Sequence, residues 1–442
     1  MKLAIVVQRY GAELNGGAEL HARYVAEHLN KHSHVEVLST CASDYITWRN
    51  HFEPGLESIN GVSVRRFPVS KERNPADFGR RSEKVFKEKH SFADELAWLS
   101  SEGPLSPALV KYLKEHEDHY DYHIFFSYRY YHAYHGIRAL PNKAILVPTA
   151  ERDPALGLSI FRPIFLGVRA LMYNSFEERS IIQNISGNNH VPGVVVGVGS
   201  EIPPRSSARR FRQNTGLKNR FAIYVGRIDE NKGCGELFKY FSQYAKSSQK
   251  LDLVLIGNPV MEIPSHPRIH HLGFLSDREK FDAMSAANLL IMPSYYESLS
   301  MVTIEAWAMG LPVLVNGACD VLHGQVIRSN AGLYYNNYEE FSETLKLLER
   351  KRELRFALGS NGRKFFRENY SWPVIERKYL ETFDHLKDQD KSYLNHTLEP
   401  VPGWLSRYRR NLAPSAEILE NLPKGPAVYS SNGHDQTLRS QK

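Results

Sequence analysis

Two glutamates, Glu297 and Glu305, stand eight residues apart in one of the most apolar segments of this chain. Acidic side chains are rarely buried without a partner, so this placement requires a structural or functional reason. The apolar run at 287–293 predicts a strand of a parallel sheet that is covered on both faces. A second strand is predicted at 312–316, so the residues between the two strands form a loop and a crossover helix.

The expected ends of this helix determine whether Glu297 and Glu305 lie on the loop or in the helix. Ser298 or Ser300 suits the N-cap, while Gly310 and Pro312 predict the end of the helix. The first glutamate then falls on the loop at the carboxyl end of a strand, and the second falls inside the helix. Ligands bind at this edge in open α/β sheets. A structural role stays open, in which the second glutamate pairs with a neighbouring arginine and the first is solvated.

Length and charge set the broad class. The chain has 442 residues, of which 42% are hydrophobic and 24% charged, and this length suits two domains of ordinary size. The net charge of +7 favours phosphorylated ligands, anionic lipid surfaces or nucleic acid. The sequence contains no RNA-binding signature, zinc finger or basic heptad region, so nucleic acid is not an expected partner.

The cysteines and the apolar runs indicate in which cellular compartment the protein is expected. Cys41, Cys234 and Cys319 are widely spaced and odd in number, which resembles neither a disulfide framework nor a metal cluster, and a reducing compartment is expected. The first apolar run, 1–7, is short for a signal peptide. No apolar run approaches the roughly 20 residues of a membrane-spanning helix. We expect a cytoplasmic protein, with peripheral contact at the inner membrane face as a further interpretation.

A glycine pair follows the first predicted strand, at 2–7. Gly16 and Gly17 precede an amphipathic pattern from about 18 to 31, and backbone N–H groups at such a helix start can approach an anion. The dinucleotide-binding spacing G-x-G-x-x-G is absent. Two interpretations stay open, namely an anion-binding loop and a plain tight turn.

Strands and helical patterns alternate through the first half, which predicts a parallel sheet with crossover helices. A polar and basic segment at 71–92 is interpreted as a solvated helix face, or as a contact for a membrane or an anionic acceptor. The remaining predicted strands of this half lie at 35–40, 62–69, 122–127, 144–149, 170–175 and 194–199.

Aromatic and imidazole side chains gather after the predicted strand at 122–127. Arg129, His132 and His135 lie in this segment, and Asp153 follows the next strand. Aromatic rings can stack on sugar faces, and an arginine can bind phosphate. The alternative is the start of an amphipathic helix that packs its tyrosines.

A second alternating series begins after a polar, proline-containing segment at 200–220, which we interpret as an interdomain linker. Two doubly wound units in tandem would enclose a cleft. The predicted strands of this second series lie at 221–225, 253–256, 269–272, 289–292, 313–315 and 332–335.

Two cations follow the first strand of the second series. Arg227 comes directly after Gly226, and Lys232 directly before Gly233. A guanidinium offers a planar fork to phosphate oxygens, and an ammonium offers a mobile point charge. At the ligand-binding edge of a sheet, this pattern favours a diphosphate clamp over two unrelated surface cations.

In their order and spacing, these motifs resemble the second domain of the glycosyltransferase family 4 (group 1) enzymes. The Gly16–Gly17 turn is similar to the family's N-terminal glycine loop. The resemblance covers roughly residues 1–387 and is most specific from 221 to 335. The motifs that carry it are Gly226-Arg227 with Lys232, the run 254–257, Leu272-Gly273-Phe274, and Glu297-x7-Glu305 with Gly310-x-Pro312.

The resemblance implies the GT-B architecture, in which two Rossmann-like, doubly wound domains face each other across a cleft. An N-terminal, acceptor-side domain is expected at 1–205, and a C-terminal, nucleotide-sugar donor domain at 218–370. The last helix typically crosses back to the first domain, and residues 372–387 fit that crossing. Residues 388–442, with a basic and aromatic patch at 404–410, are expected to form a partly disordered basic tail.

The family transfers a sugar from a nucleotide diphosphate donor with retention at the anomeric carbon. By this resemblance Glu297 would accept hydrogen bonds from the sugar hydroxyls and Glu305 from the ribose. Arg227 and Lys232 would hold the diphosphate. Further donor contacts are implied at Gly16, Gly17, Gly226, Gly273, Phe274, Ser300 and Met301.

One departure from the family pattern falls in the first domain. Relatives often carry a histidine after the strand that ends here at Thr149, whereas this chain has Glu151-Arg152-Asp153. Glu151 is a candidate replacement, and His132, His135, Arg129 and Asp153 are candidates for the acceptor side or the reacting centre. Acceptor deprotonation by the departing phosphate is a further interpretation.

No cofactor beyond the nucleotide-sugar co-substrate is expected, and no metal. Fixed cations and a helix N-terminus can stabilise the departing phosphate where a metal would otherwise act. The D-x-D sequence at 388–390 follows no predicted strand and is interpreted as chance.

The predicted function is therefore transfer of a hexose-type sugar to a glycan or lipid-linked acceptor in polysaccharide or glycolipid biosynthesis. The alternative is a non-catalytic, nucleotide-sugar-binding partner subunit. A GT-B-fold epimerase is disfavoured by the matched cation and glutamate set, and a dinucleotide oxidoreductase by the missing glycine fingerprint.

Overall fold

The computed structural model describes residues 1–14, 16–247, 251–389 and 394, and these contain two mainly parallel sheets. The first sheet has the strand order β3-β4-β2-β1-β5-β6-β7-β8, in which only the β3–β4 pair is antiparallel. The second has the order β11-β10-β9-β12-β13-β14 and is parallel throughout. In both sheets the strand order reverses beside the first strand, which is where α/β proteins bind ligands.

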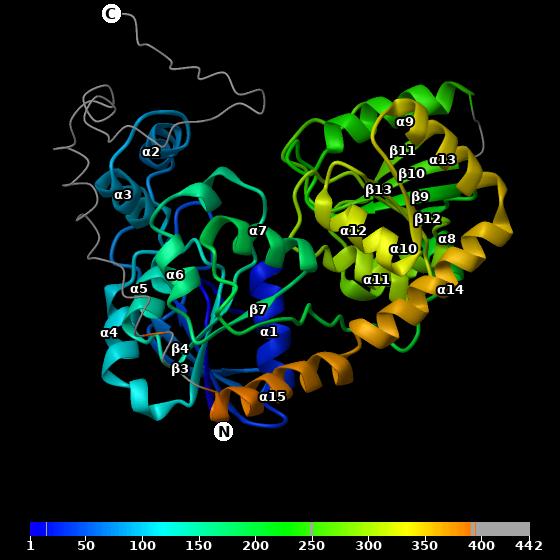
Figure 1. Cartoon of the computed structure of the whole chain (residues 1–442). Helices are drawn as coiled ribbons and strands as arrows, with labels where there is room; N and C mark the ends of the chain where they lie inside the picture. Colours follow the sequence, from blue (N-terminus) through cyan, green and yellow to red (C-terminus); the bar gives the residue numbers. More distant parts are fainter. Residues whose placement is uncertain (15, 248–250, 390–393, 395–442) are drawn as a thin grey trace, which may run out of the picture. The chain divides into compact units, whose positions relative to one another are not determined.

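The first sheet and its helices occupy the first half of the chain (Figure 1). Its elements are β1 (Lys2–Val6), α1 (Gly17–Leu29), β2 (His34–Thr40), β3 (Gly55–Ile59), β4 (Val62–Phe67), α2 (Pro75–Lys87), α3 (Phe92–Glu102), α4 (Pro107–Glu115), the 3-10 turn η1 (Glu117–His119), β5 (Tyr122–Phe126), α5 (Tyr131–Ala139), β6 (Ala144–Val147), the 3-10 turn η2 (Pro154–Gly157), α6 (Arg162–Leu166), β7 (Ala170–Tyr173), α7 (Phe176–Ser186) and β8 (Gly193–Val195).

The second half repeats the alternation and then adds three helices in succession. Its elements are α8 (Ala208–Thr215), β9 (Arg220–Val225), α9 (Cys234–Ser247), β10 (Leu251–Ile256), β11 (Ile269–His271), α10 (Asp277–Ala286), β12 (Leu289–Met292), α11 (Met301–Met309), β13 (Val313–Asn316), α12 (Asp320–Ser329), β14 (Gly332–Tyr335), α13 (Tyr338–Arg350), α14 (Arg352–Asn369) and α15 (Trp372–Asp388).

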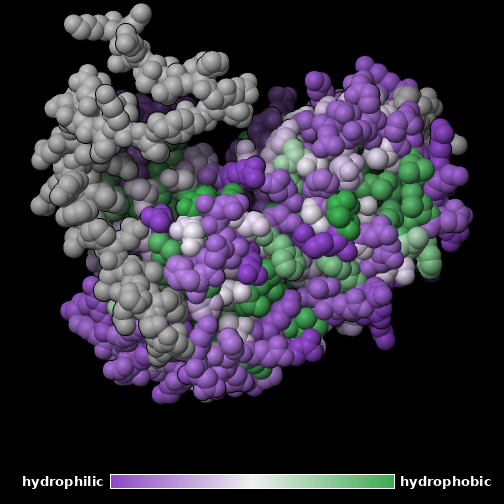
Figure 2. Space-filling model, viewed as in Figure 1, coloured by the Kyte–Doolittle hydropathy of each residue, from purple (hydrophilic) through white to green (hydrophobic). Residues whose placement is uncertain are grey.

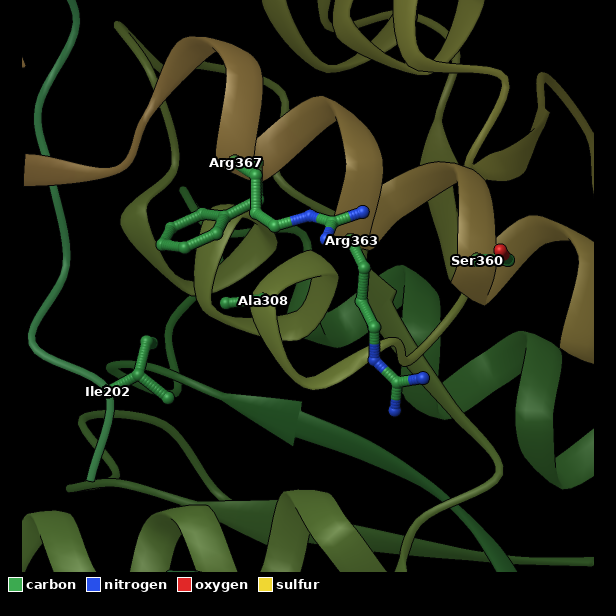
Figure 3. Close-up of a pocket in the computed structure, with 6 residues that line it drawn as sticks. Ile202, Ala308, Ser360, Arg363 and Arg367 are labelled. Atoms are coloured by element: carbon green, nitrogen blue, oxygen red, sulfur yellow. The ribbon is translucent and has the colours of Figure 1, made fainter. Parts of the chain in front are cut away.

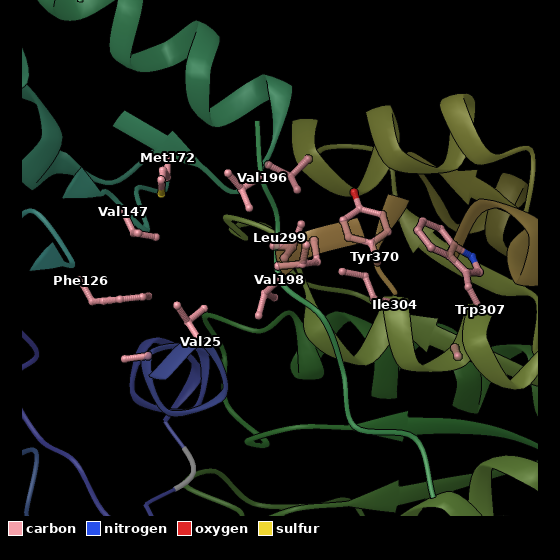
Figure 4. Close-up of a cluster of buried hydrophobic side chains, with 14 of the residues drawn as sticks. Val25, Phe126, Val147, Met172, Val196, Val198, Leu299, Ile304, Trp307 and Tyr370 are labelled. Atoms are coloured by element: carbon pink, nitrogen blue, oxygen red, sulfur yellow. The ribbon is translucent and has the colours of Figure 1, made fainter. Parts of the chain in front are cut away.

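The central strands of each sheet are buried on both faces, as the continuous apolar strands predict. Along β1, Leu3 and Ile5 join one hydrophobic cluster, while Ala4 and Val6 join another on the opposite face. The first of these clusters continues into the second half, where it includes Ile304 and other side chains of α11 (Figure 4). Charged residues therefore concentrate on the outside, and Figure 2 shows a mainly hydrophilic surface with small hydrophobic groups.

The last helix returns to the first half, as predicted. Tyr379 and Phe383 of α15 are buried, and the Phe383 ring stacks on Tyr122 of β5 with centroids 5.7 Å apart. His28 of α1 lies between Glu376 and Glu201, at 2.5 and 2.6 Å. These contacts complete the GT-B fold that the sequence predicts.

The interpretation of 200–220 as an aperiodic linker is wrong in part. Residues 208–215 form α8, whose Ser207 N-cap side chain accepts a hydrogen bond from the Arg210 N–H at 3.2 Å. Phe211 is buried, and Arg210 pairs with Asp282 of α10. The predicted tail at 388–442, including the patch at 404–410, lies outside the described residues except for positions 388, 389 and 394.

Candidate functional site

Two loops of the second sheet approach each other through glycines. Gly233, after β9, has a φ of 71°, and a Cβ atom there would collide with the carbonyl of Pro293, after β12. Gly257, with a φ of 137°, would likewise collide with the carbonyl of Gly226. Only glycine fits both the backbone conformation and the space. These positions bring the loops 226–233 and 293–300 together at one edge of the sheet.

Lys232 and Glu297 meet at this edge. The Lys232 Nζ lies 2.8 Å from Glu297 Oε1, and the two side chains are 28% and 12% exposed. Asp229 holds the lysine backbone through an N–H···Oδ1 bond of 2.7 Å and also pairs with Arg227. Half of the Arg227 side chain remains exposed, so its guanidinium can still receive a ligand oxygen.

Glu151 comes to the same cations from the first half of the chain. Burial raises the pKa of Glu151, the nearby Lys232 opposes this shift, and the carboxylate of Glu297 reinforces it. Burial alone would lower the pKa of Lys232, but the two carboxylates outweigh it and the net shift is upward. The Lys232 ammonium therefore interacts electrostatically with two carboxylates, which follow strands of different sheets.

Glu305 lies in α11 and is 3% exposed. Its Oε1 is 2.9 Å from the Nζ of Lys280, which also lies 3.1 Å from Asp277. Its Oε2 is buried, and no partner for it lies among the described residues. Burial raises the pKa of Glu305 while Lys280 opposes the shift. The predicted arginine partner is thus a lysine, and one carboxylate oxygen stays available for a hydroxyl donor.

Ser300 is the N-cap residue of α11, with a left-handed φ of 67°. Its hydroxyl lies 2.9 Å from that of Thr303 instead of capping a backbone group. The N–H groups of the first helical turn, including that of Met301, are left by the helix geometry for another acceptor. They carry the positive end of the helix dipole toward whatever the loop 293–300 binds.

Gly16 and Gly17 begin α1, and a buried ion pair lies directly beneath them. The Arg9 Nη2 is 2.6 Å from Glu19 Oε1, with side chains only 11% and 6% exposed. A Cβ atom at Gly16 would collide with this carboxylate. The sequence motifs do not point to Arg9 and Glu19, although an arginine just after a first strand and an acid in the next helical turn are available signals.

The acceptor-side candidates form two separate groups. Arg129 pairs with Asp153 at 3.0 Å and with the buried Glu102 at 2.8 Å. His132 is fully enclosed, and burial lowers its pKa to about 3. His135 is half-buried beside α4, with its pKa lowered to about 4 by burial and by neighbouring cations. Of these candidates, Arg129 and Asp153 belong to the same charge network as Glu151.

Gly273 and Phe274 follow β11. Gly273 has a φ of 73°, and its carbonyl accepts a hydrogen bond of 2.8 Å from the Gly257 N–H. The Phe274 side chain is 61% exposed. The turn is therefore fixed to the same edge as Gly226, while the aromatic ring is free to receive a planar ligand.

Glu178 of α7 stabilises the backbone just before Glu151. Its Oε1 accepts from the Ala150 N–H at 2.6 Å, and its Oε2 from the Asn174 N–H at 2.5 Å. The residue is 1% exposed, and burial raises its pKa to about 8 against these hydrogen bonds. The sequence places Glu178 in a helix start after Ser175, but gives no sign of its contact with Ala150.

The second half of the chain matches a known family. Residues 206–365 match the family described as "Glycosyl transferases group 1". Through these residues the chain is similar to the group 1 glycosyltransferases. The N-terminal half lies outside this match.

Relatives and solved structures agree with this family. The capsular polysaccharide biosynthesis glycosyltransferase CapM of Staphylococcus aureus is 27% identical over 183 residues, which are 37% of this chain and 47% of CapM. The matched region thus spans about half of that relative. The Anabaena Alr3699/HepE structure with UDP-glucose has a TM-score of 0.65 at 16% identity, over 87% of this chain and 100% of that one. A sucrose-phosphate synthase of Thermosynechococcus elongatus gives 0.63 at 16% identity, over 87% and 99%.

Membrane-spanning helices and metal-binding clusters are both absent from the described residues. No helix among them is both long and apolar enough to cross a bilayer. In the same residues, no group of three or more histidine, cysteine, aspartate or glutamate side chains could hold a metal ion. Metal independence stays a prediction.

Proposed function

We propose that this protein is a retaining, metal-independent glycosyltransferase of family 4. It would move a hexose-type sugar from a nucleotide diphosphate sugar to a glycan or lipid-linked acceptor in polysaccharide or glycolipid biosynthesis. The observation that carries this proposal is the 2.8 Å ion pair of Lys232 with Glu297, with Arg227 on the same loop and the charge of Glu151 acting on the lysine. The similar HepE structure is a complex with UDP-glucose, which supports a donor of this class here.

The donor would lie along the edge of the second sheet. Lys232 and Arg227 would bind the diphosphate, with the N-terminal end of α11 adding positive potential. An ionised carboxylate offers only acceptors, and two oxygens suit the paired hydroxyls of a sugar or a ribose. Glu297 would therefore bind the transferred sugar, and the unpartnered oxygen of Glu305 the ribose.

In the reaction, the bond between the anomeric carbon and the β-phosphate oxygen breaks, and its electron pair stays on that oxygen. The acceptor oxygen forms the new bond on the same face of the sugar, and its proton passes to the departing phosphate. Lys232 stabilises the charge that develops on the phosphate. Glu151 would bind the reacting sugar or the acceptor hydroxyl from the first half, in the place where relatives often carry a histidine.

The test uses a panel of UDP-, GDP- and ADP-sugars and measures release of the nucleoside diphosphate with and without acceptor extracts. We expect Lys232→Met to reduce kcat/KM by about 10²- to 10³-fold with the best donor, because it removes a charge aimed at the leaving group. Lys239→Met, an exposed lysine of α9, is the matched control and should leave the rate unchanged.

Two outcomes would contradict this function. If the wild-type protein binds a donor but releases no nucleotide with any acceptor, the non-catalytic subunit is the better description. If Lys232→Met and Lys239→Met have equal rates, the diphosphate clamp is wrong. Peripheral binding to an anionic membrane remains a proposal, and vesicle co-sedimentation tests it separately.

A further inference from the structure

A hollow lies beside α11, on the flank formed by α14. Its volume is about 290 Å³, near the lower end for sites that hold small molecules. Figure 3 shows Arg363 and Arg367 extending from α14, with Ala308 on the neighbouring α11 and Ile202 across from them. The residues that line it are Ile202, Ala308, Ser360, Arg363, Phe366 and Arg367.

Beside the hollow, α14 packs closely against α11. A Cβ atom on Gly359 would collide with the Gly310 carbonyl, and one on Gly362 would press on the Trp307 ring. The two helix backbones are therefore in near contact at these positions. Next to this contact, the small side chain of Ala308 leaves space, and Ile202 and Phe366 supply apolar walls.

The charged side chains that line the hollow are all positive. Arg363 and Arg367 are exposed and four residues apart on one helix face, an arrangement of like charges that weakens a helix. None of the lining residues is acidic. Arg363 donates to the carbonyl of Met309 at 2.9 Å, and neither arginine forms an ion pair with another described residue. Two guanidinium groups without a counter-charge are suited to an oxyanion.

We propose that this hollow binds a small organic oxyanion, such as a phosphate ester, and that its occupancy changes the affinity of the donor site. The binding part follows from the two arginines that line the hollow beside Ile202 and Phe366, with the Ser360 hydroxyl as a further donor. The regulatory part rests on the proposed function.

Only a short stretch of structure separates the hollow from the proposed donor site. Ala308 lies one helical turn after Glu305 on α11, so a ligand in the hollow touches the helix that carries the ribose carboxylate. Ile202 belongs to the segment that joins the two sheets, and Arg367 precedes the start of α15 by five residues. A ligand that contacts all three would favour one arrangement of the two halves over others, and would shift the donor affinity with it.

Direct binding is measured first, without donor or turnover. Inorganic phosphate, a hexose phosphate and citrate are titrated by calorimetry into the wild type, Arg367→Gln and Arg367→Glu. Lys364→Gln is the matched control, because Lys364 is exposed on α14 but does not line the hollow. All titrations are repeated in a Lys232→Met background, since the diphosphate clamp also attracts phosphate.

We expect the hexose phosphate to bind more tightly than inorganic phosphate, because it also covers the apolar walls. Arg367→Gln should weaken binding about tenfold, Arg367→Glu should abolish it, and Lys364→Gln should have no effect. Equal affinities in the wild type and Arg367→Glu, or no binding of any probe, would overturn the site. Binding by inorganic phosphate alone would overturn the organic ligand.

The regulatory part is measured afterwards as the donor KM with and without the best anion. A KM that changes in the wild type but not in Arg367→Glu supports it, and a constant KM refutes it. Because the anion titrations need no catalysis, failure of the hollow and failure of the proposed transferase reaction give different results.

Discussion

Replacement of Glu178 by glutamine is expected to change how stability depends on pH. This carboxyl group is 1% exposed and receives the backbone N–H groups of Ala150 and Asn174. The Asn174 side-chain amide lies 3.3 Å away and can turn its oxygen toward a protonated carboxyl group. Glutamine fills nearly the same volume but cannot ionise, so the Glu178→Gln comparison isolates one titration.

The magnitude follows from the pKa of about 8 in the folded chain, against an ordinary value of 4.5. Below pH 4.5 the carboxyl is protonated in both the folded and the unfolded chain. Between 4.5 and 8 only the unfolded chain releases the proton, so the free energy of unfolding falls as pH rises. At 1.36 kcal/mol per pH unit, the wild type loses about 5 kcal/mol relative to Glu178→Gln across this window.

Thermal unfolding of both proteins from pH 5 to pH 8.5 captures about 4 kcal/mol of this difference, because the two titrations overlap the ends of that range. For a domain of roughly 200 residues, about 4 kcal/mol corresponds to a relative shift of about 8–16 °C in the unfolding midpoint. Glu339→Gln, at an exposed position of α13, is the control and should keep a constant offset. A constant offset for Glu178→Gln as well would show that this carboxyl group titrates normally, and that burial does not control its charge.

Four further outcomes are expected. Trp307→Ala, at a fully buried ring, should lower the free energy of unfolding by about 3–5 kcal/mol in urea titrations, and a loss below 1 kcal/mol would contradict the packing described. Gly359→Val should cost about 1–3 kcal/mol in the same assay, because its side chain meets the Gly310 backbone. Glu305→Gln should raise the donor KM about 10- to 100-fold if the buried oxygen binds the ribose, with unchanged KM as the opposing result. EDTA should leave nucleotide release unchanged, and loss of activity that Mg²⁺ or Mn²⁺ restores would refute metal independence.

Strands with continuous apolar runs can be predicted to within a few residues, although the predicted strand at 194–199 extends four residues beyond β8. β12 and β14 have the predicted bounds, 289–292 and 332–335, because each run ends at turn-forming or polar residues. β3 is not among the predicted strands. Four of its five residues are exposed, so no apolar pattern marks this antiparallel edge strand. α8 escapes prediction for a related reason, since Phe211 is its only buried side chain.

The sequence predicts the site as a set of residues, but not as a set of contacts. Motif spacing predicts that Lys232 and Glu297 lie at the same edge of the second sheet. The structure shows in addition that they form an ion pair. Lys280, the partner of Glu305, comes from a separate helix that no local pattern connects to it. The support of Ala150 by Glu178 is equally remote in sequence. Such partners depend on packing between elements, which local periodicity does not encode.

The returning helix has a consequence for synthesis of the chain. Ile375, Tyr379, Phe383 and Leu386 of α15 are buried, and the ring of Phe383 stacks on β5 of the first half. A ribosome completes the first sheet near residue 195 but supplies these side chains only some 180–190 residues later. At 5–20 residues per second, the apolar surface that α15 will cover stays open for on the order of 10–40 s. During that interval the nascent first half offers a binding face to chaperones or to another unfinished copy, a vulnerability that ends when α15 docks.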